Sequence, residues 1–269
     1  MSAGKGTGII AVFRNVIDLI DEIGRTIQFL FLILRTAIKT PCRIHLIYEQ
    51  IWAVSIQSLP TTAMAGFFVG AIMTVQFTMQ IKEFGALAYL GALSTSGTIR
   101  EIGPLLIAFM LSGKVGAYTS AELGTMRVTE QIDAIRCLGA NPIQEIILPR
   151  FIAIILSSFF LLAAGLLMSI FGGLLLGSVF SGVSPEEYLR FVPTIVAWPS
   201  VASGLFKCLA FSLVLAVICT YKGYTATGGA KGVGRAVVVT SVSTMIAIVF
   251  FDWLTSYISE ATLIAVRGF

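Results

Sequence analysis

Three ionisable side chains lie inside stretches of sequence that are otherwise apolar: Glu101, Lys207 and Asp252. A buried charge is costly unless it is paired or hydrogen-bonded, so two kinds of chemistry remain open for them. They form a structural ion pair that locks helices together, or they form a polar patch in a cavity that binds a charged ligand. The single histidine, His45, lies outside these stretches, which leaves no ingredients for a His-based metal site or a catalytic triad.

A second candidate site is a stripe of mostly apolar residues with the spacing of one helical face. Its members follow the pattern i, i+4, i+7, i+8 and i+11: Met73, Phe77, Gln80, Ile81 and Phe84. Such a stripe packs against a neighbouring helix, or it lines an apolar cavity when two copies of the chain face each other.

Two glycine-rich segments fail as nucleotide-binding loops. Residues 4–8 (GKGTG) lack the GxxxxGK[ST] spacing, and residues 228–234 (GGAKGVG) lack the preceding strand of a dinucleotide loop. Any energy source must therefore belong to another molecule. The net charge of +4 does not indicate a nucleic-acid partner, because the cations lie between apolar blocks and are explained by membrane topology.

The elements that must position these residues are apolar blocks long enough to cross a membrane. Of the 269 residues, 57% are hydrophobic and 12% are charged, about half the charged fraction of a typical soluble domain. Residues 50–81 and 151–185 contain no Lys, Arg, Asp or Glu, and a spanning helix needs about 20 apolar residues. The chain is therefore predicted to be an all-α polytopic membrane protein, with one domain over residues 1–269.

Five transmembrane helices are expected, at residues 50–80, 96–118, 150–178, 200–221 and 236–258. Before them, residues 9–38 carry five charges on one helical face, which predicts an amphipathic helix that lies in the membrane interface. The alternative is a first span built on residues 27–38. Between the second and third spans, residues 121–145 form a polar segment with turn signals at residues 139–142. By its own pattern this segment is an amphipathic connector.

Lys and Arg concentrate in the N-terminal region, in the connection between spans two and three, and in that between spans four and five. The cation-rich side is cytoplasmic, so the N-terminus is expected inside and the C-terminus outside. Glu101, Lys207 and Asp252 then lie five to seven residues from the outer face, at roughly 8 to 10 Å depth. Because their depths agree and their charges are opposite, Glu101 and Lys207 are expected to be neighbours, with Asp252 as the alternative partner of Lys207.

Several motifs together closely resemble the MlaE/YrbE family of ABC transporter permeases, over about residues 45–260. They are REIGP at 100–104, Gly113-x-x-Gly116, AELGTM at 121–126, TEQIDA at 129–134 and Pro149-Arg150. Within them, the run from Asp133 through Gly139 to Pro149 is similar, with a shorter spacing, to the ATPase-docking loop of ABC importer permeases. The resemblance therefore marks a coupling helix with these ATPase-contacting residues: Glu122, Thr129, Glu130, Gln131, Asp133, Ala134 and Gly139.

The resemblance implies a homodimeric permease of the inner membrane that moves phospholipid. It implies two ATP-binding ABC subunits that hold ATP and Mg²⁺, so that this chain binds no cofactor of its own and is not the enzyme. It also implies a hexameric MCE-domain protein outside and, in many systems, a small STAS-domain subunit. Acyl chains would then lie on the stripe from Met73 to Phe84, and the headgroup would lie near Glu101, Lys207 and Asp252.

Two other classes of function compete with this expectation. An ion-coupled secondary transporter of a small polar solute would use Glu101 and Asp252, but the sequence shows no internal repeat of the kind that such transporters carry. A membrane enzyme acting on lipids would need a histidine, a carboxylate pair or a metal constellation. The chain offers only His45, outside the spans.

Overall fold

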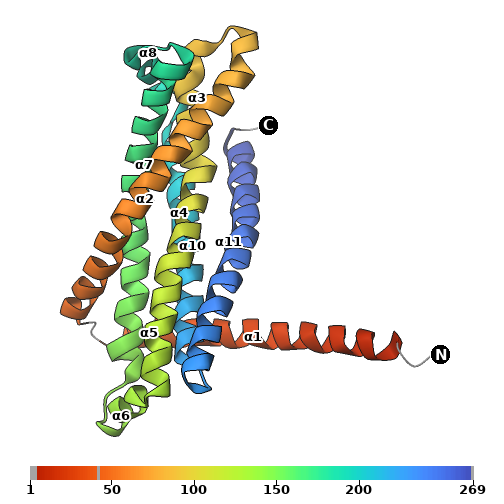
Figure 1. Cartoon of the computed structure of the whole chain (residues 1–269), viewed down its shortest axis with the longest axis vertical. Helices are drawn as coiled ribbons and strands as arrows, with labels where there is room; N and C mark the ends of the chain where they lie inside the picture. Colours follow the sequence, from red (N-terminus) through yellow and green to blue (C-terminus); the bar gives the residue numbers. More distant parts are fainter. Residues whose placement is uncertain (1–4, 41–42, 268–269) are drawn as a thin grey trace.

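A computed structural model describes residues 5–40 and 43–267, which form helices and no β-strand (Figure 1). Five helical units in these residues are long and apolar enough to cross a membrane. Their bounds are Ile44–Phe84, Leu87–Val128, Ile143–Ser181, Trp198–Tyr224 and Gly229–Thr262. Each unit contains one of the five predicted spans, so the expected all-α polytopic membrane fold is confirmed.

The first two units meet at the end of the bundle that carries α8 (Figure 1). The first is a nearly continuous helix, made of α2 (Ile44–Ile81) and η1 (Lys82–Phe84). The second is a composite that contains two π-helical turns, η3 and η4. Its parts in order are η2 (Leu87–Tyr89), α3 (Leu90–Gly97), η3 (Thr98–Ile102), α4 (Gly103–Leu111), η4 (Ser112–Gly116) and α5 (Ala117–Val128).

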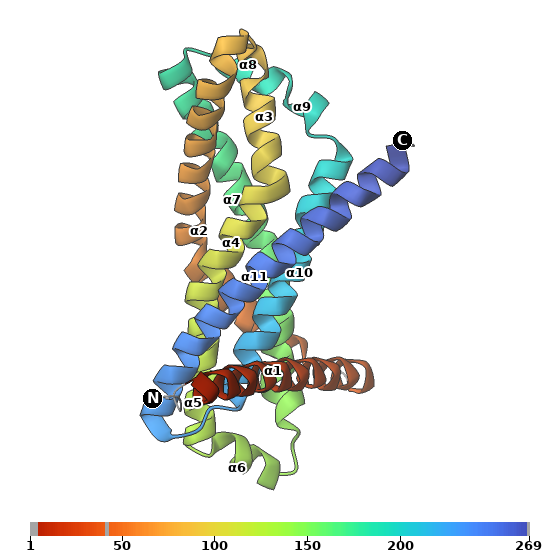
Figure 2. The same cartoon turned by 90° about the vertical axis from the view of Figure 1, so that its right-hand side faces the viewer.

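The remaining units complete the bundle, and α6 marks the end opposite to α8 (Figure 1). In Figure 2, α11 crosses the bundle obliquely in front of α10. The elements in order are α6 (Gln131–Cys137), η5 (Ile143–Ile147), α7 (Leu148–Ser181), α8 (Pro185–Arg190), α9 (Val192–Ile195), α10 (Trp198–Tyr224) and α11 (Gly229–Arg267).

Helices α2 and α7 pack closely against each other along much of their length. A Cβ atom at Gly70 would lie 1.8 Å from the carbonyl oxygen of Ser169, so only glycine permits this approach. Hydrogen bonds between hydroxyls join the two helices near both ends, from Ser55 to Ser157 (3.0 Å) and between Thr78 and Ser181 (2.7 Å). This pair therefore forms a rigid wall of the bundle.

Helix α1 (Lys5–Lys39) runs across the α6 end of the bundle rather than along it (Figures 1 and 2). It is not among the five candidate spans, so the alternative of a first span at residues 27–38 is not supported. Its side chain Phe29 is buried and packs on the rings of Tyr221 and Tyr224, with ring centroids 5.6 Å away in each case. These contacts attach α1 to the end of α10.

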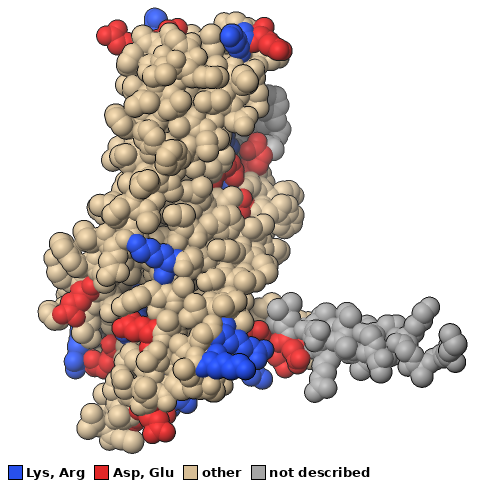
Figure 3. All heavy atoms as spheres, in the orientation of Figure 1, with Lys and Arg blue, Asp and Glu red and all other residues tan. Residues whose placement is uncertain are grey.

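Charged side chains gather at the two ends of the molecule, and the surface between them is largely uncharged (Figure 3). A small group of acidic and basic atoms interrupts this uncharged zone about midway up one side (Figure 3). Charges at that level are unusual in a membrane-spanning bundle and mark a candidate site.

Candidate functional site

The centre of the candidate site is the ammonium group of Lys207, on α10, whose side chain has no exposed surface. Lys207 Nζ donates to Glu101 Oε2 on η3, to Asp252 Oδ1 on α11 at 3.0 Å and to Ser256 Oγ on α11 at 2.7 Å. A lysine ammonium has three N–H donors, so each one has a partner. The predicted contact of Glu101 with Lys207 is confirmed, and Asp252 binds the same ammonium rather than competing for it.

The local backbone explains how Glu101 reaches α10. Pro104 has no N–H to offer the carbonyl of Arg100, four residues earlier, and the chain passes through the π-helical turn η3 just before it. A Cβ atom at Gly204 would lie 2.5 Å from the carbonyl oxygen of Ile99. Gly204 therefore lets α10 approach η3 closely, one turn before Lys207. This close approach brings the Lys207 ammonium into contact with the Glu101 carboxylate.

The two carboxylates differ from the lysine in their access to the surface. The Glu101 side chain is 48% exposed and that of Asp252 is 21% exposed, so the site is open on its acidic side. Next to Glu101, Arg100 Nη2 lies 3.5 Å from Glu260 Oε2, which adds an ion pair that joins η3 directly to α11. The turn η3 and helix α11 thus present acidic and basic groups together at the surface, above the buried Lys207 of α10.

Sequence reasoning missed Ser256. Its hydroxyl accepts from Lys207 and lies 3.3 Å from Glu101 Oε2. The available signal was its position four residues after Asp252, on the same face of the helix.

The stripe, which runs along α2 and ends at Phe84 in η1, divides into a packed part and an exposed part. Phe77 and Ile81 pack against the small core of Leu90, Val183 and Tyr188. Met73 and Phe77 lie against Gly97, directly before η3. In contrast, Gln80 and Phe84 are exposed. The packing interpretation therefore holds for Phe77 and Ile81 within one chain, and Gln80 and Phe84 remain available to a ligand or partner.

At the other end of the bundle, α6 is held by ion pairs. Arg127 Nη1 lies 2.8 Å from both carboxylate oxygens of Asp133, and Arg136 Nη1 lies 3.3 Å from Asp133 Oδ1. Arg136 also donates to the hydroxyl of Tyr224 on α10. The predicted coupling residue Asp133 therefore fixes α6 to α5.

Other predicted coupling residues divide between an ion pair within the chain and positions in turns. Glu122 Oε1 lies 2.8 Å from Arg150 Nη2 on α7, so the carboxylate of Glu122 is paired with a cation of the same chain. Glu130 and Gly139, which were expected on the helix, lie just outside it in left-handed backbone conformations, with φ of 60° and 80°. Thr129 is exposed in the turn before α6.

The outward face of α6 consists of Gln131, Ala134 and Leu138, spaced i, i+3 and i+7, with Leu138 just past the end of the helix. All three are exposed, and Leu138 has 85% of its surface exposed. Sequence reasoning did not select Leu138. Its exposed side chain gives the tip of this segment an apolar contact point.

Comparisons with known proteins agree with this architecture. A family described as Permease MlaE matches residues 47–258. A probable ABC transporter permease protein of Rickettsia prowazekii is 33% identical over 90% of this chain and 94% of its own length. A similar probable permease of Synechocystis is 34% identical over 78% of this chain and 80% of its own. The intermembrane phospholipid transport system permease protein MlaE of Haemophilus influenzae is 27% identical over 93% of this chain and 96% of its own length.

Proposed function

The chain belongs to the MlaE permease family, and from that premise we propose that it is the membrane subunit of an ATP-driven phospholipid transporter. It works as a homodimer in the inner membrane, with its N-terminus in the cytoplasm. Two ABC subunits hold ATP and Mg²⁺ and perform hydrolysis, while this chain provides the lipid path. A hexameric MCE-domain protein exchanges lipid with it outside, and a STAS-domain subunit joins the ATPases.

The observation that carries this proposal is the fully buried Lys207, bound by Glu101, Asp252 and Ser256 between three membrane helices. A charged group at that depth is costly, and the half-exposed carboxylate of Glu101 gives a polar ligand access to the acidic side of this cluster. The headgroup of a phospholipid carries both a phosphate and, in zwitterionic lipids, a cation. Such a headgroup can bind to the Lys207 site while its acyl chains lie on the exposed side chains of α2.

The α6 segment is the proposed contact with the ATPase. A short helix that projects from a membrane bundle can transmit a rigid-body motion from a partner subunit. The ion pairs of Asp133 with Arg127 and Arg136 hold α6 rigidly against α5. The bond from Arg136 to Tyr224 links it to α10, which carries Lys207. Movement of α6 is thereby coupled to the helix that holds the candidate lipid site.

Photocrosslinking in the assembled transporter tests the lipid path. Probes at Gln80 and Phe84 should capture phospholipid, and capture should fall when ATP drives lipid transfer to the MCE protein. A probe at Met79, also exposed but on another face of α2, is the matched control. Equal labelling at Met79, with no response to ATP, would show simple exposure to the bilayer.

A further inference from the structure

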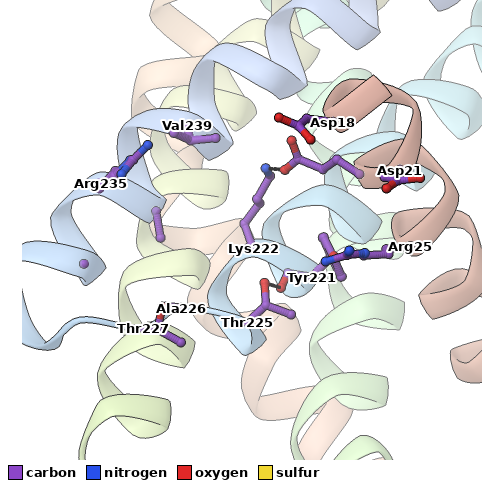
Figure 4. Close-up of a pocket in the computed structure, with 13 residues that line it drawn as sticks. Asp18, Asp21, Arg25, Tyr221, Lys222, Thr225, Ala226, Thr227, Arg235 and Val239 are labelled. Atoms are coloured by element: carbon purple, nitrogen blue, oxygen red, sulfur yellow. Dashed lines mark hydrogen bonds and ion pairs between the residues drawn. The ribbon is translucent and has the colours of Figure 1, made fainter. Parts of the chain in front are cut away.

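A polar cavity of about 520 Å³ lies between α1 and the adjoining ends of α10 and α11 (Figure 4). Its volume is within the range of roughly 300 to 1,000 Å³ that is usual for small-molecule sites. Ionisable groups line it from both sides: Asp18, Asp21, Glu22 and Arg25 from α1, Lys222 from α10 and Arg235 from α11. The cavity is separate from the Lys207 site, because Lys222 follows Lys207 by fifteen positions on α10, which is about 22 Å of helix.

The charges in this lining balance. Three carboxylates face three cations, which gives a formal net charge of zero. Lys222 reaches from α10 toward α1 and forms an ion pair with Glu22 (Figure 4). Among the residues that the structure describes, no ion pair involves the other four groups, which are Asp18, Asp21, Arg25 and Arg235. Two acidic and two basic side chains are therefore free to bind a ligand.

The positions of these free charges indicate which charges a ligand of this cavity must carry. Asp18, Asp21 and Arg25 lie on the α1 wall, whereas Arg235 is the one free charge on the α11 wall (Figure 4). A simple anion such as free phosphate would meet three carboxylates, and a simple cation would meet three basic groups. A ligand that carries a phosphate and an ammonium a few bonds apart can satisfy both walls with charge-assisted hydrogen bonds.

The cavity also continues into an apolar surface. Ala236 and Val239 of α11 line it, and Ile246 and Phe250 follow Val239 at i+7 and i+11, on the same face of the helix. Ile246 is 66% exposed and Phe250 is 56% exposed. This track extends about 16 Å along α11 beyond Val239. An acyl chain attached to a headgroup in the cavity can lie on it, which a water-soluble ligand does not require.

We propose that this cavity binds the headgroup of a zwitterionic phospholipid, with the phosphate at Arg235 and the ammonium at Asp18 and Asp21. The proposal rests on the proposed function in taking phospholipid as the ligand, and it adds a second lipid site at the α6 end of the bundle. Helix α1 then contributes directly to lipid binding, through the polar face that its charge spacing creates.

Native mass spectrometry of the purified full-length chain tests this assignment, with titrations of phosphatidylethanolamine and phosphatidylglycerol. Arg235→Gln and the double variant Asp18→Asn/Asp21→Asn should each weaken phosphatidylethanolamine binding at this site about tenfold, because each removes a charged hydrogen-bond partner. Lys231→Gln, an exposed cation on the same helix outside the cavity, is the matched control and should change nothing. Arg235→Lys should retain most of the binding.

The Asp18→Asn/Asp21→Asn variant should change the binding of the anionic lipid phosphatidylglycerol in the opposite direction. Phosphatidylglycerol should bind more weakly than phosphatidylethanolamine to the wild-type chain and more strongly to the Asp18→Asn/Asp21→Asn variant, because carboxylates that repel it are gone. Equal binding of both lipids, or no effect of any variant, would overturn the proposal. Binding of glycerophosphoethanolamine as tight as that of the lipid would identify a soluble ligand and would also overturn it. Crosslinking at Gln80 and Phe84 reports on the other site, so failure of one assignment is distinguishable from failure of the other.

Discussion

Lys207 Nζ lies 3.0 Å from Asp252 Oδ1, yet the lysine side chain has no exposed surface while 21% of the aspartate side chain is exposed. The buried lysine therefore needs the aspartate as a partner for its charge more than the aspartate needs the lysine. Water can reach the carboxylates of Asp252 and Glu101 if the ammonium is removed. The Lys207 ammonium has only its protein partners, so it is the member of this group that cannot be left alone.

This inequality predicts an order of stabilities. The double variant Glu101→Gln/Asp252→Asn should destabilise the chain by about 3–5 kcal/mol, because it leaves a buried charge without its carboxylates. Lys207→Met should cost less, because the remaining carboxylates can be hydrated. The unfolding midpoints of the purified chain in detergent measure the order. A midpoint for Lys207→Met below that of the double variant would contradict it.

The depth of this site could be predicted from the sequence, but its full composition could not. Helix rise is regular and polar residues mark the ends of each span, so Glu101, Lys207 and Asp252 could be placed at one level. Which faces meet depends on the rotation of each helix. That rotation is set here by the close approach at Gly204 and the π-helical turn η3, neither of which has a clear signature in one sequence.

The α6 segment shows the same limit at the other end of the bundle. Its polar pattern and turn residues predicted only an amphipathic connector, and the resemblance to ABC permeases indicated a coupling helix. The partners of charges in the predicted coupling region were not predictable either, since Glu122 on α5 binds Arg150 on α7, 28 residues away. A surface leucine next to a glycine is also common after a helix, so Leu138 carried no distinct signal.

Substitutions on the outward face of α6 should separate docking from folding. Leu138→Asp and Ala134→Glu are expected to release the ATPase subunit or to uncouple its ATP turnover from lipid. Stability should change by no more than about 0.5 kcal/mol, because both positions are exposed. Copurification with the ATPase and lipid-stimulated ATP hydrolysis are the measurements.

Leu189→Asp provides the matched control, since it introduces the same change at an exposed leucine of α8, at the opposite end. It should leave ATPase binding intact. If Leu138→Asp and Ala134→Glu both retain full ATPase binding and coupling, α6 is only a connector.

A native cysteine allows the membrane topology to be tested. Cys137 at the end of α6 is exposed, whereas Cys208 and Cys219 are buried. In a Cys42→Ser background, an impermeant maleimide should label Cys137 only from the cytoplasmic side of sealed vesicles. A cysteine introduced at exposed Glu187 of α8 should react only from the other side. The reverse pattern would exclude the orientation with the N-terminus in the cytoplasm.

Removal of all three charges should distinguish a structural ion cluster from a site that binds a headgroup. The triple variant Glu101→Gln/Lys207→Met/Asp252→Asn leaves no uncompensated charge, so its stability and its assembly with the ATPase should stay close to those of the wild type. Lipid transfer to the MCE protein in proteoliposomes should nevertheless fall at least about tenfold, because the loss of one charged hydrogen bond to the headgroup costs roughly 1.5–3 kcal/mol. Arg43→Gln/Glu145→Gln neutralises another ion pair, 3.1 Å long and distant from Lys207, and should leave transfer unchanged. Transfer at the wild-type rate by the triple variant would mean that Glu101, Lys207 and Asp252 only hold the helices together, and the headgroup site would have to lie elsewhere.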